Sequence, residues 1–454
     1  MEFIINAIVV ISDWVWSYPL MLVLVGGGTY LLFYAGFAPF AYFRHAIGIM
    51  QGKYDLEHEQ GDISHYQALS SAIAATVGMG NISGVAIAIA TGGPGAVFWM
   101  WVCAVIGMAS KFFECSLAIM YRETDAKGQT HGGPMYYMKL GLGKWGTLLG
   151  VLFSIFGLIG CLPLFTANQL TEALRYLVFV PMGVEKESFL YLNLGIGIGM
   201  ALLSALVILG GIKRIGNIAG YLFPVMVGAY LLLALWALGM NFEKIPAMFA
   251  LIFYDAFTAT SVQGGLLGSL IVIGVRRAAF SNEAGLGTSP MMHGAAKTQE
   301  PIREGLVAML GPFVDTIVIC TITALLIILA GVWQGVDKNQ GIHITALALD
   351  KLVPVVGRYI LLFCALIFAL TTLFSYSYYG SKCFVFLFGQ KYQMLYAYFY
   401  LFSIVLGAVS SLSVIISLID LSYALMALVN MPVVLYLSPK VKQAMKVYFA
   451  KMKA

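Results

Sequence analysis

The sequence contains few charged residues. Of its 454 residues, 26 are Lys or Arg and 21 are Asp or Glu, so 10% of the chain is charged, whereas soluble globular domains carry about 25%. Hydrophobic residues make up 60% of the chain, and too few polar residues remain to cover a water-facing surface. The composition excludes a soluble globular protein and predicts an all-α polytopic membrane protein. Because the charges are bunched, it also leaves little room for an extramembrane enzyme or ATPase domain.

Several motifs that carry chemistry are missing. There is no phosphate loop, because Gly143-Lys144 is followed by Trp145 and lacks the upstream glycine, and there is no HExxH or CxxC motif. The six cysteines lie within or at the ends of apolar stretches, where packing is their expected role: Cys103, Cys115, Cys161, Cys320, Cys364 and Cys383. We expect a protein that is not an enzyme, uses no ATP or organic cofactor, and binds no nucleic acid.

The uncharged intervals of the sequence predict eleven membrane spans. A bilayer core of ~30 Å requires about 20 apolar residues in a helix. Seven intervals fit one helix each: 14–43, 145–171, 188–212, 215–242, 256–275, 316–336 and 359–381. Two longer intervals hold two helices each: 63–110, divided at Gly92-Gly93-Pro94, and 392–439, divided near 407–413 and interrupted only by Asp420.

Eleven spans place the termini on opposite sides of the membrane, and the distribution of Lys and Arg indicates which side is which. With the N-terminus outside, the inside segments hold 19 Lys and Arg residues, Arg276 and Arg277 among them, and the outside segments hold six. We expect a multi-pass plasma-membrane protein with an external N-terminus and a cytoplasmic C-terminus. Residues 438–454 form a basic tail, which either lies as a helix on anionic membrane lipid or extends into solvent.

Two glycine-rich segments interrupt the apolar stretches, residues 74–84 in span two and residues 264–269 in span seven. A break at membrane depth must line protein or a water-filled site, because lipid cannot satisfy free backbone groups. The breaks lie five spans apart, which is the spacing of inverted repeats formed by spans 2–6 and 7–11. This predicts an extra N-terminal helix and its connection at 1–62, a first repeat at 63–243, an inverted second repeat at 244–437, and the tail at 438–454. Alternatively, the glycines are only close-packing contacts between helices.

The first break offers two kinds of ligand. Free amides around Gly78 and Gly80 suit a substrate carboxylate, because they begin the second half-helix. Free carbonyls around Ala74 to Val77 end the first half-helix and suit a small cation. With side-chain oxygens from Thr76 and Asn81 added, the pattern favours a transport site over simple packing.

Longer motifs point to a family. They include Thr76-Val77-Gly78-Met79-Gly80-Asn81-Ile82, Gly92-Gly93-Pro94-Gly95-Ala96, Phe98-Trp99-Met100-Trp101, Lys111-Phe112, Gly132-Gly133-Pro134-Met135-Tyr136-Tyr137 and Phe280-Ser281-Asn282-Glu283-Ala284-Gly285-Leu286-Gly287. With these motifs, spans two to eleven resemble the alanine or glycine:cation symporter family, the sodium/alanine symporters of the amino acid-polyamine-organocation superfamily. The resemblance implies a leucine-transporter-like fold of two inverted five-helix repeats, preceded by one extra helix. It also implies Na⁺-coupled import of small neutral amino acids, alanine and glycine, by alternating access.

The resemblance further implies a cation site. Carbonyls of Ala74 and Val77 would bind Na⁺ together with hydroxyls of Thr371 and Thr372 from span nine. A second Na⁺ would lie near the Thr76 carbonyl and the Asn81 side chain.

The same reasoning gives a substrate pocket. Its expected residues are Thr76, Gly78, Met79, Gly80, Gln169, Gly264, Gly265, Gly268 and Tyr376. Family members often have a smaller polar residue in place of Met79 and a Trp in place of Tyr376, which would shift the preferred substrate among small amino acids. For Gln169, a pocket role competes with exposure at the outer mouth.

Other polar residues lie in or beside apolar stretches. Asp315 and Asp420 are gating or proton-linked candidates, since a carboxylate is costly there, although a buried structural carboxylate is the plainer interpretation for each. Lys111 and Glu114, three residues apart, predict a local ion pair. Asn282-Glu283 would close an inner gate or, in the favoured interpretation, cap a short surface helix.

Two other functions compete with sodium symport. A proton-coupled amino-acid transporter of the same fold would use Asp315 or Asp420 as the proton carrier. A channel-like or non-transporting membrane protein would need no paired helix breaks.

Overall fold

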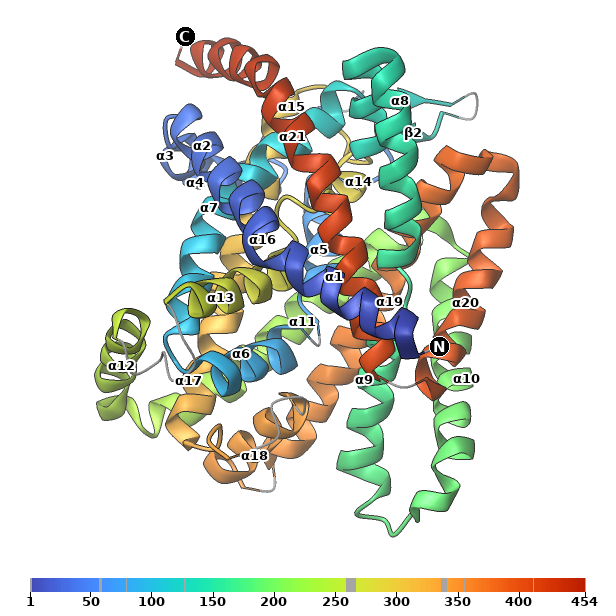
Figure 1. Cartoon of the computed structure of the whole chain (residues 1–454). Coiled ribbons are helices and arrows are strands. Elements are labelled where there is room, and N and C mark those ends of the chain that lie inside the picture. The colour runs from blue at the N-terminus through green and yellow to red at the C-terminus, as the bar shows by residue number, and fades with distance from the viewer. Residues whose placement is uncertain are drawn as a thin grey trace.

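The computed structural model describes residues 2–56, 59–78, 80–125, 128–258, 267–335, 341–354, 356–410 and 412–453. Within these ranges the chain forms a bundle of helices and one two-stranded antiparallel hairpin, in which Glu123 pairs with His131 (Figure 1). The hairpin consists of β1 (Glu123–Thr124) and β2 (Thr130–His131).

The first part of the chain contains the helices of the first six predicted spans, several of which are divided into two or more helical segments, and a few short connections. The elements are α1 (Glu2–Met21), η1 (Leu22–Gly26), α2 (Gly27–Tyr34), α3 (Ala38–Ala41), α4 (Phe43–Met50), α5 (His65–Thr76), η2 (Gly80–Gly84), α6 (Val85–Gly92), α7 (Ala96–Met120), α8 (Pro134–Gly160), α9 (Leu164–Leu174), η3 (Arg175–Phe179), η4 (Lys186–Ser188), α10 (Phe189–Ile208) and α11 (Gly211–Gly239).

The second part continues with η5 (Phe242–Lys244), α12 (Ile245–Phe257), α13 (Leu267–Asn282), α14 (Ser289–His293), α15 (Pro301–Ala308), α16 (Leu310–Pro312), η7 (Phe313–Cys320), α17 (Thr321–Ala330), α18 (Gly341–Leu352), α19 (Val356–Phe388), η8 (Gln390–Tyr392), α20 (Gln393–Val409) and α21 (Leu412–Lys453). The longest of these are α19 and α21, with 33 and 42 residues.

The described residues contain nine helical stretches long and apolar enough to cross a membrane: Val10–Tyr34, Ala96–Met120, Pro134–Phe179, Lys186–Ile208, Gly211–Gly239, Pro301–Ala330, Val356–Phe388, Gln390–Val409 and Leu418–Met452. A tenth is the pair His65–Thr76 and Gly80–Gly92, if the bent pair counts as one span. These ten correspond to ten of the eleven predicted spans. The remaining one, span seven, was predicted at 256–275 and lies partly outside the described residues, between α12 and α13.

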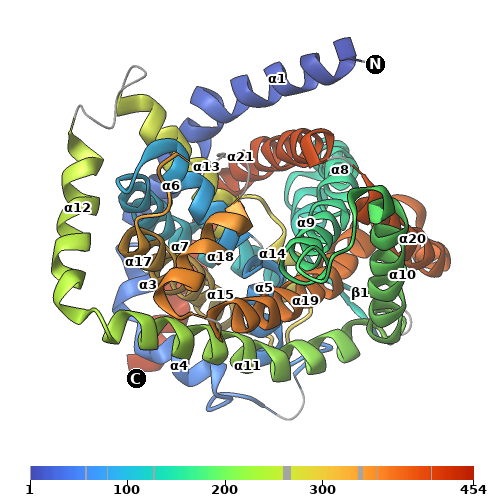
Figure 2. The ribbon, with the colours of Figure 1, turned by 90° about the horizontal axis from the view of Figure 1, so that it is seen from below.

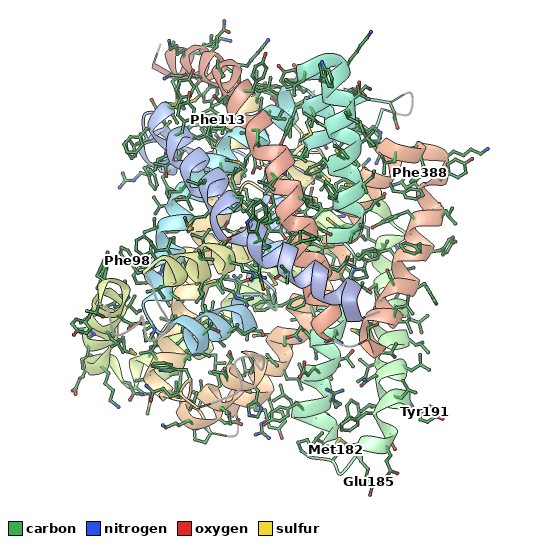
Figure 3. All side chains as sticks on the ribbon, viewed as in Figure 1. Phe98, Phe113, Met182, Glu185, Tyr191 and Phe388 are labelled. Atoms are coloured by element: carbon green, nitrogen blue, oxygen red, sulfur yellow. The ribbon has the colours of Figure 1, made fainter. Side chains whose placement is uncertain are left out.

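The helices form a buried core and an outer layer that exposes apolar side chains. Side chains of α7 and α19 are largely buried, whereas α10, α11 and α12 form the outside of the bundle (Figure 2). These outer helices expose large apolar side chains, among them Leu206, Leu232 and Trp236 at 66% or more. Phe98 of α7 lies at the edge of the bundle, where its ring meets Phe253 and Phe257 of α12 (Figure 3). Because lipid tails are as apolar as these side chains, such exposure costs little in a bilayer.

The C-terminal segment is helical rather than frayed. Helix α21 continues through the predicted tail to Lys453, and Val441, Met445 and Tyr448 on one face are buried. The Phe449 ring stacks on Tyr42 with centroids 3.8 Å apart. The apolar face of the tail is therefore occupied by the segment that follows the first span.

Candidate functional site

The first predicted break interrupts span two. Helix α5 begins at a capping box in which the Ser64 hydroxyl accepts from Gln67 N, and it ends at Thr76. The next residue, Val77, has extended dihedral angles (φ −72°, ψ 93°), and the helical axis turns by 51° before Gly80–Gly92 continues. The bend separates two half-helices, so backbone groups at the end of α5 are free to face a site.

Helix α19 packs directly against this break. The Thr372 hydroxyl donates to the Ala74 carbonyl at 3.1 Å, and the Ser375 hydroxyl donates to the Ser71 carbonyl at 2.9 Å. A Cβ atom on Gly78 would lie 2.8 Å from Thr372 Oγ1, closer than real Cβ contacts permit. Glycine at position 78 therefore lets the break approach the hydroxyl of Thr372.

The structure thus brings together part of the expected cation set. Ala74, Val77 and Thr372 are buried at the break, with Thr372 on Ala74. The neighbouring Thr371 hydroxyl instead donates to the Ile367 carbonyl of its own helix at 2.9 Å. Consecutive residues of a helix point about 100° apart, which explains why only one hydroxyl of the pair faces the break.

Helix α13 ends in a second break. The segment 283–288 is not helical, Glu283 has φ +52°, and Gly285 and Gly287 have φ +86°. The sequence placed the break of this span at 264–269. Gly264 and Gly265 lie outside the described residues, and Gly268 belongs to the first turn of α13. Within the described residues, α13 ends in a break at Glu283 to Thr288 that the sequence did not predict, whereas the break predicted at 264–269 lies mostly outside the described residues and stays a prediction.

Two buried charged residues of α7 hold the second break. The Lys111 ammonium donates to the Ser289 hydroxyl, and Gly285 N donates to the Glu114 carboxylate at 3.2 Å. Asn430 of α21 donates both to Glu114 and to the Gly285 carbonyl. The predicted local ion pair between Lys111 and Glu114 is wrong, because both side chains turn toward polar groups of the unwound segment.

Asn282 and Glu283 are also buried, so they do not cap a surface helix. The Glu283 carboxylate accepts from Tyr376 of α19 and from Thr288, the latter at 2.5 Å. The Tyr423 hydroxyl of α21 donates to the Tyr376 hydroxyl at 2.8 Å. The second break is thereby linked to α19 and α21.

A cavity with an empty volume of about 490 Å³ lies beside the first break. Its lining comes from α5, the first break, the end of α8 and the turn after it, α9, α13, α19 and α21: Ala75, Thr76, Gly78, Gly80, Gly160, Leu162, Phe165, Thr166, Phe280, Thr372, Tyr376, Ile419 and Tyr423. Of the expected substrate residues, Thr76, Gly78, Gly80 and Tyr376 line this central cavity, and Met79 lies outside the described residues. Gly268 is not part of the described lining.

A second cavity, with an empty volume of about 870 Å³, adjoins the central one and shares Gly80, Phe165, Phe280 and Ile419 with it. We call it the vestibule. Gln169 lines the vestibule rather than the central cavity; it is buried, and its Oε1 accepts from Ser83 at 3.4 Å.

Arg276, Arg277 and Asp420 also line the vestibule, and Arg276 forms an ion pair with Asp420. The placement of both arginines in a cytoplasmic loop is therefore wrong, because α13 extends past them to residue 282. Removing them from the inside count of 19 leaves 17 Lys and Arg against six outside, so the charge bias is preserved.

A buried polar cluster surrounds Asp315 of η7. Asn81 Nδ2 donates to Asp315 Oδ1 at 2.6 Å, and the Ser281 hydroxyl donates to Oδ2 at 2.5 Å. Thr316 and Asn282 complete the cluster. Asn81 belongs to the first break and Ser281 precedes the second, so Asp315 connects both.

A second buried cluster was missed in the sequence. Glu304 accepts from His65 through Oε2 and lies 2.5 Å from His293 Nδ1 through Oε1, and all three side chains are at most 1% exposed. The carboxylate joins the starts of α5 and α15 to α14. Residues 228 positions apart in sequence meet here, and no local spacing reveals such a pair.

Among the described residues, no group of three or more His, Cys, Asp or Glu side chains is arranged to hold a metal ion.

Comparisons with known proteins show the family to which the chain belongs. A family model described as the sodium:alanine symporter family matches residues 1–454. The chain is 40% identical over 442 residues to the sodium/alanine symporter AgcS of Methanococcus maripaludis, with 96% of each chain covered. It is 36% identical over 451 residues to the amino-acid carrier protein AlsT of Bacillus subtilis, covering 99% of this chain and 92% of that protein.

Among solved structures, the crystal structure of MhsT in complex with L-phenylalanine resembles this chain with a TM-score of 0.62. The match covers 83% of this chain and 89% of that one at 16% identity, so it concerns the fold alone.

Proposed function

The chain belongs to the sodium:alanine symporter family, and on that premise we propose that it imports a small neutral amino acid, alanine or glycine, together with Na⁺. It is a transporter rather than an enzyme. The observation that carries the proposal is the contact between Thr372 and Ala74 at the wall of the central cavity. The Thr372 hydroxyl therefore adjoins both the end of helix α5 and the cavity available to a substrate.

The cation step follows from this contact. The Thr372 hydroxyl and the Ala74 carbonyl, 3.1 Å apart, are close enough to bind one Na⁺ when the hydroxyl turns its lone pairs toward it. Val77, with its extended backbone, would supply a further carbonyl. Thr371 is the weaker member of the expected set, because its hydroxyl bonds within α19.

The substrate step uses the other half of the break. Amides at the start of Gly80–Gly92 carry the positive end of a helix dipole and would bind the amino-acid carboxylate. Thr76 and Tyr376 line the same cavity, and the glycines at 78 and 80 bring the backbone close to the ligand. Aromatic rings of Phe165, Phe280 and Tyr423 limit the remaining space, which favours a small side chain.

A second cation is proposed at Asp315. Its carboxylate and the Asn81 amide are buried together at the first break, and the Ser281 and Thr316 hydroxyls add oxygen atoms. Na⁺ bound here would satisfy a carboxylate that has no paired cationic side chain within hydrogen-bond distance among the described residues. The alternative, a proton carried by Asp315 on the same fold, is supported by the same burial.

Alternating access would then open the site on one side at a time. We propose that the two breaks belong to inverted five-helix repeats, spans 2–6 and 7–11, that move against each other around the central cavity. One Na⁺ moving inward contributes about 2.3 kcal/mol per 100 mV of membrane potential. The proposed location is the plasma membrane with the N-terminus outside and the C-terminus inside, where exposed lysines of the tail would meet anionic lipid.

Transport by purified protein in proteoliposomes tests the proposal. Labelled alanine and glycine should accumulate with an inward Na⁺ gradient and stop accumulating when choline replaces Na⁺ at fixed pH. Full uptake in choline would instead establish the proton-coupled alternative, and no uphill accumulation under any gradient would support a channel-like protein.

Two neighbouring substitutions test the cation site. Thr372→Ala should abolish Na⁺-dependent uptake, whereas Thr371→Ala should retain most of it because that hydroxyl faces its own helix. Unchanged Na⁺ dependence in Thr372→Ala would overturn the assignment. Asp315→Asn should lower the apparent Na⁺ affinity if Asp315 binds a second cation.

A further inference from the structure

The N-terminal helix has one face directed into the protein. Ser12, Val15 and Trp16 are at most 4% exposed, whereas Trp14 on the opposite face is 67% exposed. Positions 12, 15 and 16 share a helix face by their spacing of three and four. Helix α1 lies diagonally over α21 and beside α13 (Figures 1 and 2). Helix α1 lies outside both predicted repeats, so the repeats alone do not explain the function of its buried face.

Trp16 makes three contacts with the walls of the vestibule. Its indole N–H donates to the Asp420 carbonyl at 2.9 Å. Its ring stacks on Phe280 with centroids 5.3 Å apart and planes 23° from parallel. The Arg276 guanidinium lies 5.6 Å from the ring centroid, within range of a cation–π attraction.

Asp13 adds a charge to the same place. Its carboxylate accepts from Arg276 Nη1 at 3.0 Å, and the other end of the guanidinium bonds to Asp420. Arg276 of α13 is therefore held between α1 and α21. Both carboxylates would have to release it before these helices could separate.

The contacted residues stand where the vestibule meets the central cavity. Phe280 lines both spaces, and Arg276 and Asp420 line the vestibule only. Phe280 also contacts Tyr423, with centroids 5.4 Å apart, and Tyr423 bonds to Tyr376. A movement of Phe280 would therefore change both the passage and the wall of the central cavity.

We propose that α1 is part of the gate over the central cavity, in which Trp16 holds Phe280 and Asp13 holds Arg276 in the closed position. The inference rests on the proposed function for the identity of the central cavity as the substrate site. Trp16 and Asp13 are positioning residues, because they act through Phe280 and Arg276 and do not line the cavity themselves.

Cysteine labelling measures the gate without requiring transport. Thr166 lines the central cavity, and among the native cysteines only Cys103 is not buried. In full-length Thr166→Cys, Cys103→Ser protein in detergent, the rate of modification by a charged thiol reagent reports access to the cavity. Trp16→Ala should raise this rate about tenfold and Asp13→Asn about threefold, because each shifts the population toward the open gate.

Two further variants make the test specific. Trp16→Phe keeps a ring against Phe280 and should restore a rate near the parental one. Trp14→Ala removes a tryptophan from the exposed face and should leave the rate unchanged. The proposal is overturned if Trp16→Ala and Asp13→Asn label at the parental rate, or if Trp14→Ala accelerates labelling equally. Should Trp16→Ala fail to fold, Asp13→Asn, whose side chain is 60% exposed, decides alone.

A separate readout isolates the proposed function. Alanine with Na⁺ should protect Thr166→Cys from labelling if the central cavity is the substrate site. Loss of this protection with a preserved Trp16 effect would refute the substrate assignment and leave the gate standing, whereas the reverse result would refute the gate alone.

Discussion

The glycines of the first break differ in the atoms that surround them. This difference predicts which of them transport requires. A Cβ at Gly78 would meet Thr372 Oγ1 at 2.8 Å, whereas a Cβ at Gly84 would meet no atom of the described residues within 4 Å. Both residues lie in the same glycine-rich segment, and the sequence alone treats them alike. Only the packing of α19 against the break distinguishes them.

Gly78→Ala should therefore reduce Na⁺-dependent alanine uptake by about tenfold or more, since the new methyl group displaces the Thr372 hydroxyl or the break itself. Gly84→Ala is the matched control and should transport within about twofold of the wild type, because a small substitution in open space is tolerated. Initial rates in proteoliposomes measure both. Equal rates for the two variants would show that the close approach at Gly78 is not needed for transport.

His131 links the hairpin to α19. Its ring lies 3.0 Å from the Lys382 ammonium through Nδ1 and 3.1 Å from Asp125 through Nε2. Burial and the positive charge of Lys382 lower the pKa of His131 below its usual value of 6.5, and the nearby carboxylates of Asp125 and Asp62 oppose this only in part. The neutral ring accepts a hydrogen bond from Lys382, and a protonated ring cannot.

Because the folded-state pKa is lowered, the unfolded chain binds more protons as the pH falls, and stability is lost below about pH 6.5. His131→Gln cannot be protonated in this range. Its melting temperature should fall less than that of the wild type between pH 7.5 and pH 5.5. The same loss in both proteins would mean that other groups, such as the remaining histidines, cause the acid sensitivity.

At the scale of helices, the bend in span two was predicted from the sequence, whereas the break at the end of α13 was not. In span two, Gly78 and Gly80 follow a helix end, and the structure bends there by 51°. At the end of α13, the break begins at Glu283, a charged residue with positive φ whose carboxylate accepts from the nearby Thr288 and from the distant Tyr376. Glu114, Asn430 and Tyr376 come from three other helices. A break held by tertiary contacts of this kind leaves little local signal, although the motif containing it carried the family resemblance.

The importance of packing at the second break can be tested by comparing Gly287 with Gly183, a loop glycine that has the same backbone conformation. Gly287 and Gly183 have φ of +86° and +88°, so alanine costs each a similar strain of roughly 1–2 kcal/mol. A Cβ at Gly287 would also lie 2.8 Å from Phe153 and Pro134, whereas one at Gly183 has no neighbour within 4 Å in the described part of the chain. Gly287→Ala should therefore lower both the melting temperature and alanine uptake more than Gly183→Ala. Equal effects would indicate that the break needs only the backbone conformation.

At the scale of the molecule, the charges alone predicted most of the architecture. Ten of eleven spans correspond to described helices, because long uncharged intervals have no other way to satisfy their backbone in lipid. The interval before Arg276 includes residues outside the described ranges, and its predicted end at that arginine is wrong because Arg276 lies inside α13, paired with Asp13 and Asp420 from other helices. Side-chain directions, such as Thr372 toward the break and Thr371 away from it, depend on the rotation of each packed helix. Sequence spacing does not determine that rotation.

The proposed cation and substrate sites share one wall of the central cavity, so ligands bound at both should stabilise the folded protein jointly. A ligand that binds only the folded state at 100 times its Kd adds about 2.7 kcal/mol to the free energy of unfolding. Na⁺ should therefore raise the melting temperature of the purified protein. Alanine should raise it further in Na⁺ than in choline, and by linkage alanine should lower the apparent Kd for Na⁺ by the same factor. In Thr372→Ala, Na⁺ should no longer raise the melting temperature or increase the effect of alanine on it. In Thr371→Ala, both effects should remain. If alanine raises the melting temperature equally in choline and in Na⁺, the two sites bind independently. That result would contradict coupling through the first break.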